Sequence, residues 1–173
     1  MVSHFHTSKV GDVSFKGEDS TILASASDDG LVGIHDTRAP EIVAHVNAHD
    51  RPHSVTWGKD STFVTAGLDP IVKIWDQRNL SQPLSMVQGH VPTSTSKFKR
   101  IHRPVFYGNE FLLTGGQGSS SVSVYNLSNS TLCSRGKLPE DCGDSGCIAV
   151  NGKQVAVTVD QGEILLLEPT RSQ

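Results

Sequence analysis

The sequence predicts an all-β protein in which about four sheets, each of four antiparallel strands, follow one another along the chain. The first observation is a repeat: a stretch of fourteen residues ending at Arg38 has a counterpart in the same register that ends at Arg78, forty residues later. The second observation is that a histidine precedes each stretch by about twenty residues, His6 in the first copy and His49 in the second. A period of about forty residues indicates that one small structural unit recurs along the chain.

Length and composition agree with one globular domain. The chain has 173 residues, 36% of them hydrophobic, and a formal net charge of -3. It contains no run of roughly 18 apolar residues, the length that a membrane span needs, and residues 1–10 lack the apolar core of a secretory signal. The irregular spacing of Cys133, Cys142 and Cys147 fits neither a disulfide framework nor a zinc signature. We therefore expect a soluble cytoplasmic and/or nuclear protein without metal or cofactor.

The first repeat predicts three strands at residues 10–15, 21–27 and 31–36, and an outer fourth strand at 42–46. The turn between the second and third strands is Asp28-Asp29-Gly30, because Asp-Gly supplies the positive φ angles that tight hairpins require.

The second repeat predicts the same scheme at residues 54–57, 62–66, 71–76 and 84–87. Pro70 falls in the turn before the third of these strands, where its missing N–H is tolerated.

Two later repeats are weaker. Gly89-His90 begins a third repeat, with strands at residues 111–114 and 121–125. A fourth repeat has strands at 147–150, 154–159 and 163–167, of which the first two are joined by an Asn151-Gly152 turn.

The repeats, with a histidine at the front and Trp75-Asp76 near the end of the second, resemble those of the WD-repeat β-propeller family. The resemblance implies a β-propeller of about four blades, each of four antiparallel strands, in a ring that is incomplete. The blades would span residues 6–46, 49–88, 90–137 and 138–173 of a single propeller domain or half-propeller, residues 1–173.

The family ties each blade together with a hydrogen-bonded quartet of histidine, serine or threonine, aspartate and tryptophan, and the resemblance implies such quartets here. By position they are His6, Ser27, Asp29 and His35 in the first blade, His49, Asp69 and Trp75 in the second, His90 in the third, and Thr158 and Asp160 in the fourth. Gly67 stands where the hydroxyl of the second blade is expected. Gln117, Ser119 and Tyr125 fill the remaining positions of the third blade, and Leu166 fills the aromatic position of the fourth.

Family members usually close a ring of six to eight blades, so four blades leave three alternatives. The chain is a fragment or half of a longer propeller, a half-ring that associates with itself, or a small closed four-bladed ring. An open ring exposes strand edges and apolar faces, which a second half or a second copy would cover.

Enzymatic motifs are absent from the sequence. We find no His-Glu-x-x-His, no Gly-x-Ser-x-Gly and no phosphate-binding glycine loop before a helix. The glycine-rich residues 115–118 are expected to form a turn, and the acidic residues 140–144 a solvated loop. A propeller enzyme needs converging titratable residues in its central funnel, which the sequence does not show, so we expect a non-enzymatic protein.

A basic run is the sharpest polar feature. It consists of Lys97, Lys99, Arg100, His102 and Arg103. One alternative is that it forms an exposed charged strand and loop. The other is that it binds the phosphates of a nucleic acid or an acidic peptide. The mildly acidic overall charge favours the first alternative, so a nucleic-acid partner is not expected.

Both of the first two blades end in Asp-x-Arg, formed by Asp36 and Arg38 and by Asp76 and Arg78. With Asp69 six residues upstream of Trp75, the second copy resembles the box by which some WD-repeat proteins dock onto the adaptor of cullin-RING ubiquitin ligases. The box also recurs in histone-binding members of the family. The alternative is that each arginine only pairs within its own blade.

The sequence therefore predicts a protein-protein interaction scaffold that presents loops on rigid blades to peptide segments of partner proteins. By position, the rim residues that would contact partners are Lys9, Asp28, Arg51, His53 and Leu68. The alternative functions are substrate reception for a ubiquitin ligase through the box that ends at Arg78, and histone or nucleic-acid association through the basic run of residues 97–103. No membrane partner is expected.

Overall fold

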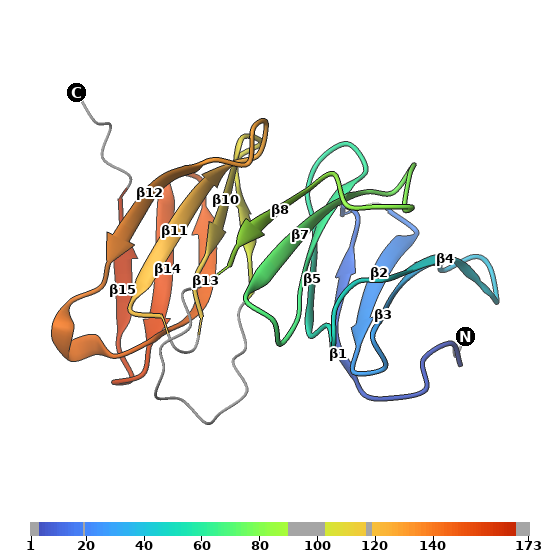
Figure 1. Cartoon of the computed structure of the whole chain (residues 1–173), viewed down its shortest axis with the longest axis horizontal. Coiled ribbons are helices and arrows are strands. Elements are labelled where there is room, and N and C mark those ends of the chain that lie inside the picture. Colours follow the sequence, from blue (N-terminus) through green and yellow to red (C-terminus); the bar gives the residue numbers. More distant parts are fainter. Residues whose placement is uncertain (1–3, 19, 90–102, 117–118, 169–173) are drawn as a thin grey trace. The chain divides into compact units, whose positions relative to one another are not determined.

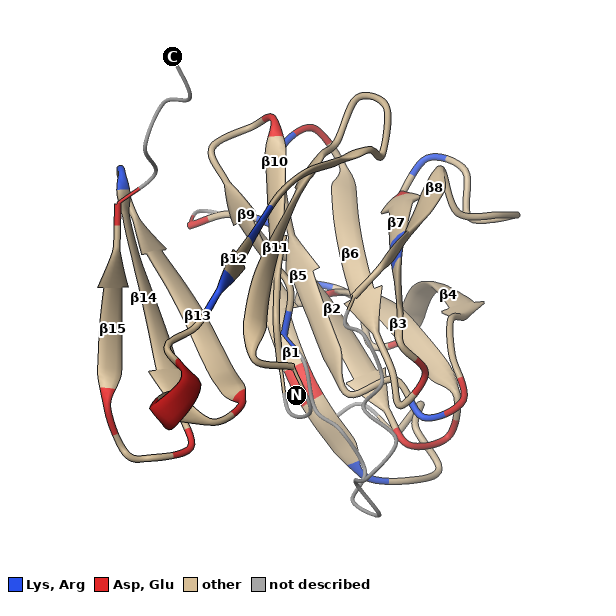
Figure 2. Ribbon diagram, turned by 60° about the vertical axis from the view of Figure 1, so that its left-hand side comes forward, with Lys and Arg blue, Asp and Glu red and all other residues tan. Residues whose placement is uncertain are grey.

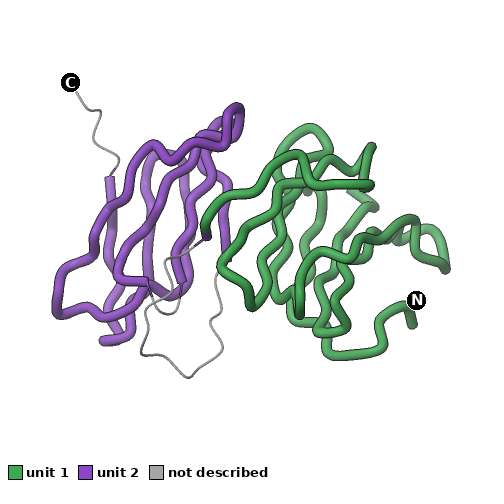
Figure 3. The backbone as a smooth tube through the Cα atoms, viewed as in Figure 1, with its two compact units in different colours: residues 1–88 green, residues 89–173 purple. Residues whose placement is uncertain are grey.

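The computed structural model of the chain describes residues 4–18, 20–89, 103–116 and 119–168. They divide into two compact units, residues 1–88 and 89–173 (Figure 3). Each unit contains two antiparallel sheets, and the described residues include no α-helix, which confirms the predicted all-β class. The described segments likewise contain no helix long and apolar enough to cross a membrane.

The first sheet of unit 1 has four strands in sequence order: β1 (Val10–Phe15), β2 (Ile22–Ser27), β3 (Leu31–Asp36) and β4 (Ile42–Asn47) (Figure 1). Gly30 closes the turn between β2 and β3 with φ 93°, a left-handed conformation that glycine adopts without strain.

The second sheet repeats this order with β5 (Ser54–Trp57), β6 (Thr62–Ala66), β7 (Ile71–Asp76) and β8 (Ser85–Gln88). Its two middle strands are largely buried, whereas β8 alternates between buried or half-buried and exposed residues.

The core of unit 1 lies between the two sheets. Small side chains such as Ala24 and Ala26 on β2 make room for Trp57, Phe63 and Trp75 of the second sheet. The rings of Trp57 and Phe63 have centroids 5.0 Å apart, and those of Phe63 and Trp75 lie stacked at 6.3 Å. Because each large side chain removed from water contributes roughly 1.5 to 3 kcal/mol, these aromatic residues dominate the stability of the unit.

Side chains of β1 also bond to the backbone of β5. Asp12 Oδ2 accepts a hydrogen bond from the Val55 N–H at 3.1 Å, and Ser14 Oγ accepts one from the Trp57 N–H at 3.3 Å. Lys16, just after β1, donates to Ser61 Oγ, just before β6, and to Gln77 Oε1, just after β7, each at 2.9 Å. The two sheets of unit 1 are therefore joined by polar contacts as well as by apolar packing.

Unit 2 contains a third and a fourth sheet. The third has β9 (Val105–Tyr107), β10 (Phe111–Thr114), β11 (Ser121–Asn126) and β12 (Leu132–Lys137), and the short 3-10 helix η1 (Glu140–Cys142) follows it. The fourth has three described strands: β13 (Ser145–Asn151), β14 (Gln154–Val159) and β15 (Ile164–Leu167). The core of this unit contains Leu113, Val122, Ile148 and Val157.

Most predicted strands agree with the structure to within one residue, but β9 and β12 were not predicted. β9 has only three residues, and all six residues of β12 are exposed, so neither shows an apolar alternation. Figure 2 shows that β12 carries basic residues, whereas elsewhere the charged residues lie mainly at turns and strand ends. The fourth repeat was predicted with three strands of its own, and the described residues contain three.

Candidate functional site

The second sheet contains a complete hydrogen-bonded quartet. Trp75 Nε1 donates to Thr65 Oγ1 at 2.9 Å, His49 Nε2 lies 2.9 Å from the same oxygen, and His49 Nδ1 lies 2.8 Å from Asp69 Oδ2. Thr65 is fully buried and His49 nearly so. Since the indole N–H can only donate, Thr65 must donate to His49 Nε2, and His49 Nδ1–H then donates to Asp69.

The hydroxyl of this quartet is Thr65, so the expectation that it falls at position 67 is wrong. Phe63 pairs with Trp75 across β6 and β7, which places Thr65 diagonally next to the indole and Gly67 two residues further away. Gly67 has a different role. A Cβ there would lie 2.4 Å from His49 Cβ, so the absence of a side chain leaves room for the histidine.

The first sheet has the corresponding quartet with His35 in place of tryptophan. His6 Nδ1 lies 3.0 Å from Asp29 Oδ2, and Ser25 Oγ lies 2.7 Å from His6 Nε2 and 2.8 Å from His35 Nε2. The prediction that Ser27 supplies the hydroxyl is wrong, because the pairing of Leu23 with His35 places Ser25 next to the imidazole. The Ser27 hydroxyl instead accepts the Asp29 N–H at 3.3 Å.

The turn aspartates of both sheets also bind backbone. Asp29 accepts the N–H groups of Thr7 at 2.9 Å and Leu31 at 3.1 Å, and Asp69 accepts the Ile71 N–H at 3.0 Å. Burial alone would raise the pKa of Asp29, but these N–H groups and His6 outweigh it and hold the pKa below its ordinary value. For Asp69, burial is outweighed in the same way, chiefly by His49, so its pKa is also lowered.

The third sheet contains part of a quartet. Leu112 pairs with Tyr125, which places Thr114 at the position of Thr65, and Thr114 Oγ1 donates to the Gly89 carbonyl at 2.5 Å. The predicted His90 and Gln117 lie outside the described residues. The predicted Ser119 donates to the carbonyl of Ser121 within its own turn.

The fourth sheet does not join its predicted quartet residues. Thr158 Oγ1 accepts the Cys147 N–H at 2.8 Å, and Asp160 Oδ2 accepts the Asp144 N–H at 3.4 Å. Both side chains therefore bind backbone N–H groups near the start of β13. No described histidine lies in this sheet.

Two matched Asp-x-Arg pairs end β3 and β7. Arg38 donates to Asp36 through Nε at 3.0 Å and Nη2 at 2.6 Å, and Arg78 donates to Asp76 through Nε at 2.9 Å and Nη2 at 2.6 Å. The arginine side chains are 73% and 75% exposed, while each aspartate is 15% exposed. Hydrogen bonds from Arg78 lower the pKa of Asp76 to about 2, so this carboxylate is charged throughout the physiological range.

The predicted rim residues differ in accessibility. Lys9, Asp28 and Arg51 are exposed and Leu68 is half-buried, but His53 is buried, which corrects its assignment to the rim. It lies just before β5 and packs against Gly11 of β1: a Cβ built on Gly11 would lie 3.5 Å from the His53 backbone.

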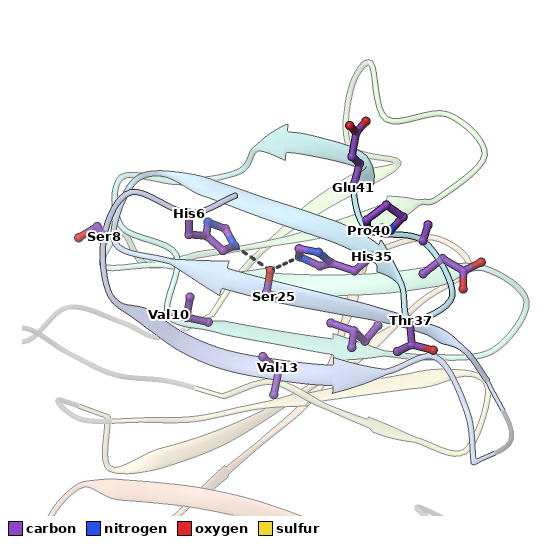
Figure 4. Close-up of a pocket in the computed structure, with 12 residues that line it drawn as sticks. His6, Ser8, Val10, Val13, Ser25, His35, Thr37, Pro40 and Glu41 are labelled. Atoms are coloured by element: carbon purple, nitrogen blue, oxygen red, sulfur yellow. Dashed lines mark hydrogen bonds between the residues drawn. The ribbon is translucent and has the colours of Figure 1, made fainter. Parts of the chain in front are cut away.

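A hollow of about 360 Å³ opens on the face of the first sheet (Figure 4). Its lining combines the apolar side chains of Val10, Val13 and Leu23 with the imidazoles of His6 and His35. Ser25 lies between these two imidazoles in Figure 4.

Of the basic run, Lys97, Lys99, Arg100 and His102 lie outside the described residues, while Arg103 is exposed. Within the described ranges, no three histidine, cysteine or acidic residues are grouped so as to hold a metal ion.

Sequence reasoning missed Ser25, Thr65 and the hollow. A signal for the two hydroxyl residues was present, since each stands four residues before the turn aspartate of its repeat. The hollow depends on which sheet face is left uncovered, which the sequence of a repeat does not reveal.

No protein-family model matches the chain. In sequence it is similar to the RbAp48-related WD40 repeat-containing protein prw1 of Schizosaccharomyces pombe, with 36% identity over 92 residues, 49% of this chain and 21% of prw1. It is 28% identical over 93 residues to histone acetyltransferase type B subunit 2 of Candida glabrata, covering 53% of this chain and 22% of that protein. WD repeat-containing protein 55 of Arabidopsis thaliana is 28% identical over 153 residues, 86% of this chain and 40% of the relative. The chain therefore spans about a fifth of the length of the first two relatives.

Among solved structures, the chain resembles the WD40 β-propeller domain of Doa1 with a TM-score of 0.79. The match covers 96% of this chain and 53% of that domain, at 14% identity, and it concerns the fold alone.

Proposed function

We propose that this chain, which is similar to WD40 repeat proteins in sequence and to a WD40 β-propeller domain in fold, is a non-enzymatic scaffold that binds peptide segments of partner proteins. WD40 repeats recur in proteins that bind other proteins, and the histone-related relatives support a protein partner. The proposal extends to a cytoplasmic and/or nuclear location, where such partners are present.

The observation that carries the proposal is the pair of exposed Asp-x-Arg ends in unit 1. Each aspartate holds one edge of a guanidinium, so Arg38 and Arg78 are fixed in direction while their remaining N–H groups face solvent. A preordered guanidinium binds a carboxylate or a backbone carbonyl of a partner with little loss of side-chain freedom. This chemistry suits an acidic or extended peptide segment.

Affinity purification with quantitative mass spectrometry tests the proposal. We expect the wild-type chain to retain a defined set of proteins that the double variant Arg38→Ala/Arg78→Ala loses. Lys59→Ala is the matched control, because Lys59 is also an exposed cation of unit 1. Retention of the same set by the double variant, with its melting temperature unchanged, contradicts the proposal.

Two narrower functions are alternatives within this proposal. Asp69, Trp75, Asp76 and Arg78 match the box associated with adaptor docking, which favours a substrate receptor of a cullin-RING ubiquitin ligase. The similarity to a histone acetyltransferase subunit favours histone association instead. Pull-down of the purified adaptor and, separately, of purified core histones by the wild type and by Arg78→Ala distinguishes the two.

Nucleic-acid association through the basic run stays a separate proposal, with Arg103 as its described member. Phosphate contacts are recognised by affinity that falls steeply as salt rises. Binding to an oligonucleotide that hardly changes between low and moderate salt would end it.

A further inference from the structure

His35 of the first sheet occupies the position of Trp75 in the second. His35 pairs with Leu23 and Trp75 with Phe63, and in both sheets the ring nitrogen contacts the hydroxyl two residues further along the neighbouring strand. The two quartets therefore share their geometry, and the groups that make their hydrogen bonds differ in kind only at this ring.

The second quartet permits one arrangement of its protons. Trp75 Nε1–H occupies one side of Thr65 Oγ1, so the threonine proton must point to His49 Nε2. A second proton on His49 would place two donors against Thr65 and leave the threonine O–H without its acceptor. Burial makes such a loss costly, so His49 is held as the Nδ1–H tautomer.

The first quartet permits two arrangements, because an imidazole nitrogen either donates or accepts. In the first, His35 Nε2–H donates to Ser25, and Ser25 donates to His6 Nε2. In the second, His6 carries both ring protons and donates to Ser25, and Ser25 donates to His35 Nε2. Every hydrogen bond among these three residues is kept in both.

We propose that the quartet of the first sheet is a proton-responsive relay, in which acid converts the first arrangement to the second while the quartet of the second sheet keeps one arrangement. The proton balance is simple. Solvent supplies one proton to His6 Nε2, the Ser25 O–H rotates from His6 to His35, and His35 exchanges its Nε2 proton for one at Nδ1. The sheet gains one positive charge.

The surroundings direct that charge to His6. Asp29, on the turn after β2, faces His6 Nδ1 at 3.0 Å, and both side chains are 7% exposed, so a positive charge on His6 lies directly against a carboxylate. Burial of His35 and the positive charge of His6 both lower the pKa of His35, which keeps His35 neutral as the acceptor.

The other charged groups near His35 do not compete for this role. His45 of β4 lies across the ring of Phe5, whose centroid is 5.4 Å from the His45 centroid and 6.2 Å from that of His35. Asp36 is paired with Arg38, and Glu41 is exposed at the edge of the hollow. The hollow connects His6 and His35 with solvent, so protons reach both rings (Figure 4).

Close packing holds His35 in place. A Cβ on Gly33 would lie 2.9 Å from His35 Nε2 and 3.1 Å from Phe5 Cε1. The residue that pairs with Ser25 must therefore be glycine, whereas the corresponding residue of the second sheet is Lys73.

Imidazole ¹⁵N chemical shifts of the full chain, measured from about pH 8 to about pH 5 across the range in which histidine titrates, test the relay. We expect His6 to change from the Nδ1–H tautomer to the imidazolium and His35 to change from the Nε2–H to the Nδ1–H tautomer at the same midpoint. His49 should keep its Nδ1–H tautomer throughout. A doubly protonated His35, or a His6 that titrates while His35 keeps its tautomer, overturns the proposal.

Reciprocal variants provide the controls. His35→Trp should make His6 as unresponsive to pH as His49, with the His6 tautomer fixed over the same range. Trp75→His should transfer the paired change to His49, and it serves if His35→Trp does not fold. An unaltered response of His6 in folded His35→Trp, or of His49 in folded Trp75→His, contradicts the role of the ring at this position.

Discussion

At the scale of single residues, one hydroxyl oxygen orders each quartet of unit 1. Thr65 Oγ1 joins the indole of Trp75 to the imidazole of His49, and Ser25 Oγ joins the rings of His35 and His6. These groups are buried or half-buried, so each hydrogen bond that is removed leaves a partner without water to replace it.

Replacing Asp69 tests the carboxylate at the end of the hydrogen-bonded quartet in the second sheet. Asp69→Ala leaves the buried His49 Nδ1–H without its acceptor, and we expect a loss of about 1 to 3 kcal/mol in the free energy of unfolding. Thermal denaturation followed by circular dichroism measures it. Glu18→Ala, an exposed carboxylate of the same unit, is the control. A melting midpoint equal to that of the control would show that the quartet adds nothing to stability.

Replacing Gly67 with alanine tests whether His49 needs the space that the glycine leaves. A methyl group 2.4 Å from His49 Cβ must displace the histidine, so Gly67→Ala should lower the free energy of unfolding by about 1 to 3 kcal/mol. At Gly17 nothing lies within 4 Å of the added atom, and Gly17→Ala should be neutral or slightly stabilising. Equal urea midpoints for the two variants would refute the packing argument.

At the scale of elements, the turns between the second and third strands are held by charged aspartates. Asp29 and Asp69 each bind the N–H two residues ahead and a histidine at the front of the repeat. A hairpin turn and the segment before the first strand are thereby fixed by one side chain.

These carboxylates make the stability of unit 1 sensitive to acid. The pKa of Asp69 is lowered in the folded chain, so unfolding takes up a proton below the ordinary aspartate value of about 3.9. The stabilisation is present above about pH 4 and is lost as the pH falls through the folded pKa. Urea unfolding of the wild type and Asp69→Asn should show a gap at pH 6 that narrows in acid. A gap independent of pH would contradict this.

The sequence was informative where a strand is bounded by turn residues and covered on a face. Strands β3, β6 and β7 were predicted with their observed bounds because aspartate, glycine or proline marks their ends. β12 was missed because its side chains are exposed and follow no period.

The error in the quartet has a different origin. Alternation places residues 25 and 27 on one face of β2, and only the pairing with β3 decides which of them meets His35. Register between strands is set by the turn and by packing, and a single sequence does not display it.

At the scale of the whole molecule, each unit keeps large apolar side chains in contact with solvent. On β1 of unit 1, Val13 is 62% and Phe15 56% exposed; on β15 of unit 2, Ile164 is 67% and Leu166 72% exposed. Contiguous apolar side chains on an exposed strand are typical of a surface that contacts another chain or segment.

We expect the chain to associate as its concentration rises, and light scattering measures the change in mass. Ile164→Ser/Leu166→Ser should reduce association with little effect on the melting temperature, because both side chains are already in water. Val157→Ser, in the buried core, should unfold unit 2 instead. A monomeric mass at every concentration would exclude self-association through β15.

The bonds from Asp12 and Ser14 to the β5 backbone limit how far the repeats are modular. Two of the amide groups of β5 are satisfied by side chains that belong to the preceding repeat. Interchanging, duplicating or excising one repeat would therefore strip its neighbour of hydrogen-bond acceptors even if every residue within the neighbour were kept. A duplication can copy the sequence of such a repeat in one step. The new interface between repeats is stable only after the residues at these two positions can accept hydrogen bonds from the backbone of the next repeat.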